Sequence, residues 1–262
     1  MSGFFRSMKI FVIFIKYNLK SKIAFYKDMK IGLFVVLTTT ALQISSLGIL
    51  FRNFNRIGDW SYRDMLLLFS IYSININVFQ FFFGNFRNLK KYIFNGELEM
   101  FLTKPVDSIL MIRCRELNVE SVIGAIIGLL IFIYCCMSIE ISFWTLLNAL
   151  LFSFSGITLL YSLVLVCQSF LFYTGYRYTP YDSLMELVGF SRYPVSIFGT
   201  LGRILLGTVI PIAFLGATPA SVLLSKDEFI FDIMPFFSVL VIFILSKVLF
   251  YKSLRRYDGL GN

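Results

Sequence analysis

Long runs of apolar residues alternate with short polar stretches along this chain of 262 residues. Most of the runs are close to the roughly 20 residues that an α-helix needs to cross the hydrocarbon core of a bilayer. We therefore predict an all-α polytopic membrane protein, in which residues 31–262 form a single six-helix transmembrane domain. The six spans are expected at residues 31–51, 65–84, 119–137, within 143–173, at 195–215 and at 234–251.

The composition agrees with this pattern. Hydrophobic residues make up 58% of the chain, charged residues only 15%, and the mean hydropathy is +0.79. Soluble domains have about a quarter of their residues charged, because charges cover a surface that faces water. The composition therefore excludes an ordinary soluble domain.

The first 30 residues are apolar and basic at once. On a helical projection four lysines form one narrow stripe, while apolar residues fill much of the remaining circumference; the lysines are Lys9, Lys16, Lys20 and Lys27. This pattern is typical of an amphipathic helix that lies in the membrane interface and turns its lysines toward anionic lipid headgroups. We expect residues 1–30 to form such a helix. The alternative is an unusually charged first span.

The distribution of Lys and Arg predicts the orientation. The segments 1–30, 85–117, 174–194 and 252–262 hold 7, 6, 2 and 3 of them, whereas the intervening loops hold 3, 0 and 1. Positive charge accumulates on the cytoplasmic side of membrane proteins. Both termini are therefore expected in the cytoplasm, and the net charge of +9 is interpreted as a signal for topology and lipid contact, with no nucleic-acid partner expected.

The residues that are missing restrict the chemistry. The chain has no histidine, its four cysteines form no C-x-x-C pair, and it has no P-loop. Histidine-based acid–base catalysis and His-ligated metal sites are thereby excluded. We predict that the chain is not an enzyme and has no catalytic residue, metal site or cofactor of its own. Any nucleotide would be bound by another polypeptide.

The polar loop 85–117 contains one helix with marked ends. Asn95 is expected to cap it and Pro105 to end it. Leu98, Phe101 and Leu102 follow the i, i+3, i+4 spacing that gives a helix one apolar face. That face needs a cover, and the membrane surface, the protein's own spans and a groove on a soluble partner all remain open.

Three segments of the chain resemble a known family. Residues 96–106 read G-E-L-E-M-F-L-T-K-P-V, which is similar to the G-x-L-[DE]-x-x-L-x-[RK]-P-[LV] segment of ATP-binding-cassette permeases of the type-2 exporter superfamily. The R-Y-P of residues 192–194, with I-P-I-A-F at 210–214 and P-A at 219–220, resembles the run through that family's fifth span. The basic, glycine-containing tail 256–261 is also similar. The predicted architecture agrees with this family over essentially the full length.

The resemblance implies a function that composition does not supply. The chain would be the membrane-spanning permease subunit of an exporter in a bacterial plasma membrane. A soluble ATPase subunit, in two copies, would bind ATP and Mg²⁺, and a second permease subunit, itself or a sister chain, would complete the path. The helix after the second span would couple to the ATPase; the candidate coupling residues are Glu97, Leu98, Phe101, Leu102, Lys104 and Pro105.

Polar residues inside the spans are candidates for the transport path or the subunit interface. Ser73, Asn77 and Gln80 belong to one seam along the second span. Such seams also serve simply to pack helices closely, and both interpretations stay open. Gln43 on the first span is expected to face the same region. Arg203, inside the fifth span, either lines the path or extends to the cytoplasmic surface.

Residues 216–233 are expected to include a short re-entrant helix, because prolines interrupt the outer end of the fifth span. Two other functions remain as alternatives. One is a secondary transporter, which would normally carry acidic residues near the middle of the membrane and internal repeats. The other is a non-transporting membrane scaffold or immunity protein.

Overall fold

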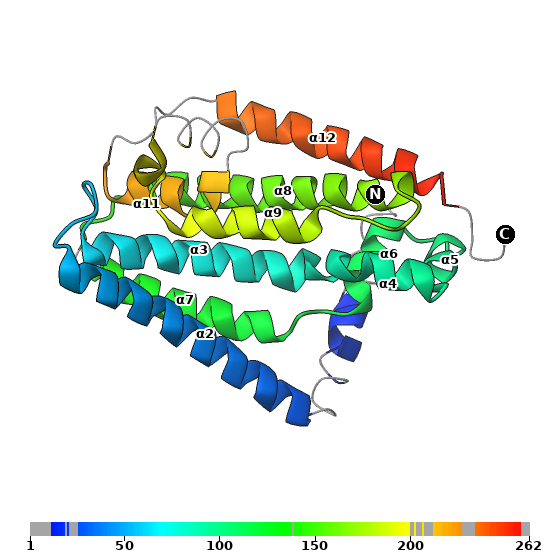
Figure 1. Cartoon of the computed structure of the whole chain (residues 1–262), viewed down its shortest axis with the longest axis horizontal. Coiled ribbons are helices and arrows are strands. Elements are labelled where there is room, and N and C mark those ends of the chain that lie inside the picture. The colour runs from blue at the N-terminus through cyan, green and yellow to red at the C-terminus, as the bar shows by residue number, and fades with distance from the viewer. Residues whose placement is uncertain are drawn as a thin grey trace.

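The computed structural model describes residues 12–18, 20, 26–137, 139–199, 202, 206, 212–226 and 234–257. It is 81% helical, and within these ranges no strand occurs; a single isolated bridge joins Ile57 and Trp60. Figure 1 shows long helices lying side by side, with short helices gathered at both ends of the bundle. The prediction of an all-α fold is confirmed.

Five long helices form the bundle: α2 (Tyr26–Asn53), α3 (Tyr62–Phe83), α7 (Glu120–Cys136), α8 (Phe143–Tyr173) and α12 (Met234–Leu254). In the described ranges, four helices are long and apolar enough to cross a membrane, or up to five if α7 counts together with the short helix before it, which is bent from it by 80°. Of the expected fifth span, residues 200–201, 203–205 and 207–211 lie outside the described residues. Six spans therefore stay a prediction.

Helix α3 contacts α2, α7, α8 and α11. Glycines on α7 let the backbones of α3 and α7 approach each other closely. A Cβ on Gly128 would lie 3.2 Å from the Ser70 carbonyl oxygen, and one on Gly124 would overlap the Asn77 carboxamide. On the other side of α3, helices α8 and α12 pack together. Helix α2 begins earlier than expected, and Figure 1 shows it diverging from α7 toward its own first residue.

A broken chain segment fills the space between α3 and α8. It consists of α9 (Tyr181–Val188), η2 (Gly189–Arg192), η3 (Val195–Phe198), η5 (Ile212–Leu215) and α11 (Ala217–Leu223). The Ser191 hydroxyl donates to the Ile212 carbonyl at 2.8 Å, and the Asn75 carboxamide of α3 donates to the Leu215 carbonyl at 2.9 Å. These side chains satisfy backbone groups that the breaks leave unpaired.

Every residue of α11 is buried, although residues 227–233 of the expected re-entrant segment lie outside the described residues. Beside α11, the Lys226 ammonium lies 2.7 Å from the Asp64 carboxylate and 4.5 Å from the ring centroid of the buried Trp60. This contact ties α11 to the start of α3. We call this end of the bundle the α11 end.

The opposite end carries η1 (Gly84–Asn88), α4 (Leu89–Phe94), α5 (Glu97–Leu102) and α6 (Ser108–Arg115), and we call it the α5 end. The helical segment 12–18 and the last described residue, Tyr257, contact this same end. The rest of the expected interfacial helix, apart from residue 20 and the first turn of α2, lies outside the described residues.

Candidate functional site

The turn into α5 depends on a glycine. Gly96 has φ +72°, a left-handed conformation that a residue without Cβ adopts at no steric cost. It is the N-cap of α5, whereas Asn95 ends α4, so the prediction that Asn95 caps the coupling helix was wrong. The helix ends at Leu102, before Pro105, as expected. The next helix, α6, starts with the Asp107 carboxylate accepting from the Leu110 amide at 2.9 Å.

The inner face of α5 is buried by the chain itself. Leu98 is 0% exposed and Phe101 is 1% exposed, and the Phe101 ring lies 5.6 Å from that of Tyr92 on α4. Of the three covers that the sequence left open, the protein's own core is therefore the one that covers these two residues. Leu98 and Phe101 hold α5 in place and are not accessible to another molecule.

The outer face of α5 is exposed to solvent. Met100 is 45% exposed and Leu102 is 37% exposed, and neighbouring polar residues share this face. We define the α5 surface as the exposed residues Glu99, Met100, Leu102, Lys104 and Pro105. Because Leu98 and Phe101 are buried in the core, α5 is held in a fixed position. Its two accessible apolar side chains therefore form a rigid surface.

Side chains connect α5 to two other helices. The Glu97 carboxylate accepts from the Arg115 guanidinium at 2.9 Å, which joins α5 to the last turn of α6. The Tyr257 hydroxyl, beyond the end of α12, donates to the Glu99 carboxylate at 3.4 Å. Burial and the adjacent Glu99 charge raise the pKa of Tyr257 above its usual value, so that the hydroxyl keeps its proton and remains a donor.

Asn18 connects the helical segment 12–18 to the loop between α6 and α7. Its Nδ2 donates to the Cys114 carbonyl at 3.2 Å, and its Oδ1 accepts from the Leu117 amide at 3.1 Å. The side chain therefore holds both the end of α6 and the loop in which the chain bends by 80° before α7. A displacement of α6 would be passed on to the N-terminal segment through these two bonds.

A cavity of about 730 Å³ lies beside this bridge, between the helical segment 12–18, the start of η1 and the loop 115–118. Its lining is largely polar and includes two arginines and two glutamates: Arg87, Arg115, Glu116 and Glu120. Gln80 of α3 lines the same cavity. Polar groups thus extend from the α5 end into the last turn of the long helix α3.

A model of one protein family, described as "ABC-2 family transporter protein", matches residues 36–261. This range contains α3, α7, α8 and α12, most of α2, and the helices η1, α4, α5 and α6 at the α5 end. The chain belongs to the ABC-2 family of transporter proteins. Comparisons with curated proteins and with solved structures gave no match. The family confirms the resemblance found in the sequence, and with the apolar helices it makes this chain a membrane protein of the permease type.

Two of the five path candidates of this ABC-2 protein lie in a helix contact. The Ser73 hydroxyl faces the Gly124 carbonyl of α7 at 3.5 Å, and the Asn77 carboxamide donates to the Ser73 carbonyl at 2.7 Å beside the same glycine. Within one subunit these two side chains support close packing of α3 against α7, which is the simpler of the two functions considered from the sequence.

The other path candidates are distributed differently. Gln80 lines the polar cavity, and Gln43 is half-buried on the peripheral helix α2. Arg203 lies outside the described residues. For the four candidates that the structure describes, a role in the transport path or in a subunit interface stays a prediction. Among the described residues, no group of three or more Cys, Asp or Glu is arranged to hold a metal ion.

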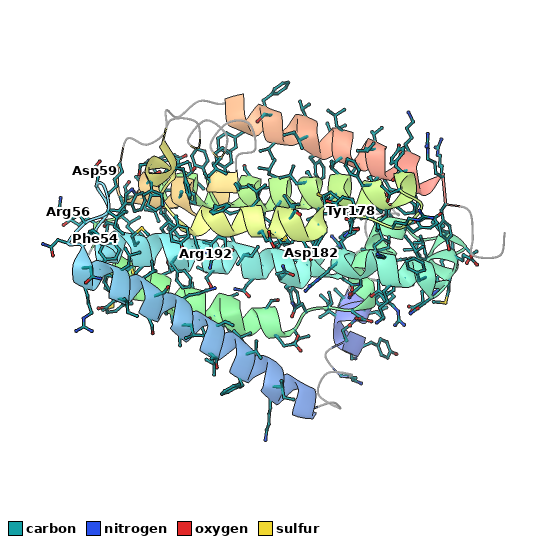
Figure 2. All side chains as sticks on the ribbon, in the orientation of Figure 1. Phe54, Arg56, Asp59, Tyr178, Asp182 and Arg192 are labelled. Atoms are coloured by element: carbon teal, nitrogen blue, oxygen red, sulfur yellow. The ribbon has the colours of Figure 1, made fainter. Side chains whose placement is uncertain are left out.

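Arg192 lies beside α3, a position that the sequence did not predict. Figure 2 shows it part-way along the bundle, nearer the α11 end than Asp182. It is close enough to Tyr72 to act on it electrostatically, and Tyr72 lies ten residues into α3, roughly 15 Å along the helix axis. The sequence placed the whole loop 174–194 on the cytoplasmic side, so it did not predict that Arg192 lies part-way along the bundle.

Proposed function

We propose that this ABC-2 protein is the membrane-spanning permease subunit of an ATP-driven exporter, and that a separate ATPase binds its α5 surface. The observation that carries the proposal is that α5 has one buried face and one accessible face. Leu98 and Phe101 anchor the helix in the core, whereas Met100 and Leu102 remain accessible beside Lys104. A short helix anchored in this way moves as a rigid body, so a displacement imposed by the ATPase is passed on to the helices behind it.

The α5 end faces the cytosol in this proposal. The support is the charge distribution: the segments 1–30 and 85–117 alone contain 13 of the 24 Lys and Arg residues. Positive residues are retained on the cytoplasmic side during insertion. The helical segment 12–18 and Tyr257, the described parts of the chain nearest its two ends, both contact the α5 end, which supports the same orientation.

Movement passes from α5 into the bundle through defined contacts. Closure of the ATPases on ATP displaces α5, and the Glu97–Arg115 ion pair carries this displacement to α6. The loop after α6, which Asn18 holds by a hydrogen bond, passes it to α7, which packs on α3. A ligand that binds one arrangement better than the other shifts the population between them.

A second permease subunit completes the path. Helix α2 is the least covered of the long helices, and a row of apolar side chains along it faces outward; they include Ile31, Phe34, Leu42 and Ile49. Lipid covers part of this face, and the second subunit covers the remainder. Gln43, on the same helix, and Arg192 then approach the boundary between subunits. Export, rather than uptake, follows from the family resemblance.

The alternatives predict different behaviour. A secondary transporter would work with no nucleotide hydrolysed, and a scaffold or immunity protein would move no cargo. The experiment that separates them is a pull-down from native membranes in a mild detergent, with crosslinking, followed by identification of the captured proteins. We expect a P-loop ATPase of soluble composition. Repeated capture without any ATPase would contradict the proposal.

A further inference from the structure

A second cavity lies between α8 and α12, and no residue of the α5 surface lines it. Its volume is about 480 Å³, within the range of roughly 300–1,000 Å³ that is usual for ligand sites. The walls are mainly apolar, with Phe154, Tyr161 and Phe243 among them, and two cations line it as well, Arg113 and Lys247. We call this cavity the α8–α12 groove.

The groove occupies one half of the membrane. Phe83, which lines it together with Arg113, is 21 residues after Tyr62, or ~31 Å along α3 at 1.5 Å per residue. That distance matches the hydrocarbon thickness of about 30 Å, so Arg113 lies near the boundary at the α5 end. Phe154 is 11 residues into α8, ~16 Å along it and close to the midplane. The groove thus runs from the headgroup level to the middle of the bilayer, which is the depth of one leaflet.

The groove faces lipid and not the protein core. Phe154 and Leu240, which line it, are both exposed large apolar residues, and Phe237 beside them is exposed too. Inside a bilayer, exposed apolar side chains contact acyl chains. A chain from the surrounding leaflet therefore reaches the groove without crossing any polar barrier.

The charges of the groove are all of one sign. Among its described lining residues there is no Asp or Glu, whereas Arg113 and Lys247 are both present. The Arg113 guanidinium lies 5.5 Å from the Phe83 ring centroid, and the Lys247 ammonium lies 4.3 Å from that of Phe243. These aromatic contacts hold both cations over the apolar walls.

We propose that the α8–α12 groove binds an anionic glycerophospholipid from the leaflet at the α5 end. One acyl chain lies along the apolar walls, and the phosphate group contacts Arg113 and Lys247. A net negative headgroup matches a lining that has two positive charges and no described negative one, and basic pockets between spanning helices on the cytoplasmic side bind such headgroups. A soluble anion would leave the apolar walls uncovered. The proposal requires only that the bundle spans a bilayer, so it is independent of ATPase binding.

The test uses the full chain purified in a neutral detergent and compares phosphatidylglycerol with phosphatidylcholine of the same acyl chains. Native mass spectrometry gives the bound fraction of each lipid, and thermal unfolding gives the stabilisation. We expect wild-type protein to prefer phosphatidylglycerol about tenfold or more, since each cation near a lipid phosphate strengthens binding several-fold. Equal binding of the two lipids would overturn the proposal.

Two variants and one control assign the effect to the groove. The double variant Arg113→Gln/Lys247→Gln removes the charges, and Thr158→Trp fills the groove from a half-buried position on α8 without changing charge. Both are expected to lose the preference. Lys252→Gln removes an exposed charge from the last turn of α12, outside the groove lining, and is expected to keep it. A preference that persists in both groove variants, or equal stabilisation by soluble glycerol phosphate, would overturn the proposal.

Discussion

The Arg115 guanidinium donates to the Glu97 carboxylate at 2.9 Å, across a separation of 18 residues. This ion pair is a side-chain connection between α5, the proposed coupling helix, and the helix α6 that leads into α7. Both side chains are partly accessible, at 45% and 23%. Its position suggests a function in transmission more than in stability.

The first prediction separates these two functions. Arg115→Ala should lower the free energy of unfolding by only about 1 kcal/mol or less, because partly exposed ion pairs contribute little. The same change should reduce cargo-stimulated ATP hydrolysis by the complex severalfold, since α5 then moves without α6. Thermal unfolding and a steady-state ATPase assay measure the two quantities.

The matched control reverses the pair. The double variant Glu97→Arg/Arg115→Glu keeps opposite charges facing each other and should recover much of the stimulation that either single change removes. If Arg115→Ala leaves stimulation at the wild-type level, the ion pair does not transmit the movement.

A second prediction concerns two neighbours on α5. Phe101→Ala should destabilise the protein by about 3 kcal/mol or more, because it opens a void behind a fully buried ring. Leu102→Ala, on the exposed face, should change stability by only about 0.5 kcal/mol. Thermal unfolding in one detergent compares the two variants. Similar losses would mean that both residues lie in the core.

This pair also illustrates the limit of the sequence. Spacing places Leu98, Phe101 and Leu102 on one apolar face, but it does not define where the neighbouring elements cover that face. The structure covers the first two and leaves Leu102 at the edge. Asn95 was a reasonable cap by residue type, yet the left-handed turn moved the helix start to Gly96.

The long elements were predictable because bilayer thickness imposes their length. Residues 119–137 were expected as a span, and α7 covers Glu120–Cys136. The depth of Arg192 was not predictable, because it depends on α9 running along the bundle, a tertiary arrangement that leaves no local pattern. The seam of Ser73 and Asn77 was correctly located, but only the structure shows its packing against Gly124.

A third prediction tests the bridge made by Asn18. The Leu117 amide donates to Asn18 Oδ1, so Asn18→Ala should speed hydrogen exchange at Leu117 about tenfold by removing its acceptor. Asn18→Asp retains an acceptor oxygen and should keep most of the protection. Hydrogen exchange with mass spectrometry over residues 112–120 measures both. Unchanged exchange in Asn18→Ala would show that another group protects this amide.

A fourth prediction uses two glycines in helices. A Cβ on Gly156 would lie 2.7 Å from the backbone of Phe214, so Gly156→Ala should separate α8 from η5 and destabilise the fold by about 1–3 kcal/mol. A Cβ on Gly48 of α2 would meet no atom within 4 Å, so Gly48→Ala should be neutral or slightly stabilising. Thermal unfolding compares the two; equal stability would contradict the close approach of α8 and η5.

The central claim is that the ATPase binds the α5 surface. Its most direct test is the dissociation constant between the captured ATPase and the purified permease, measured for wild type, Met100→Asp/Leu102→Asp and the control Phe54→Asp. Phe54 is also apolar and exposed but lies at the α11 end, as Figure 2 shows. We predict that the double variant weakens binding at least about tenfold, as expected for accessible apolar contacts at the centre of an interface, while the control binds like wild type. Wild-type affinity in the double variant, with its fold intact, would contradict the account.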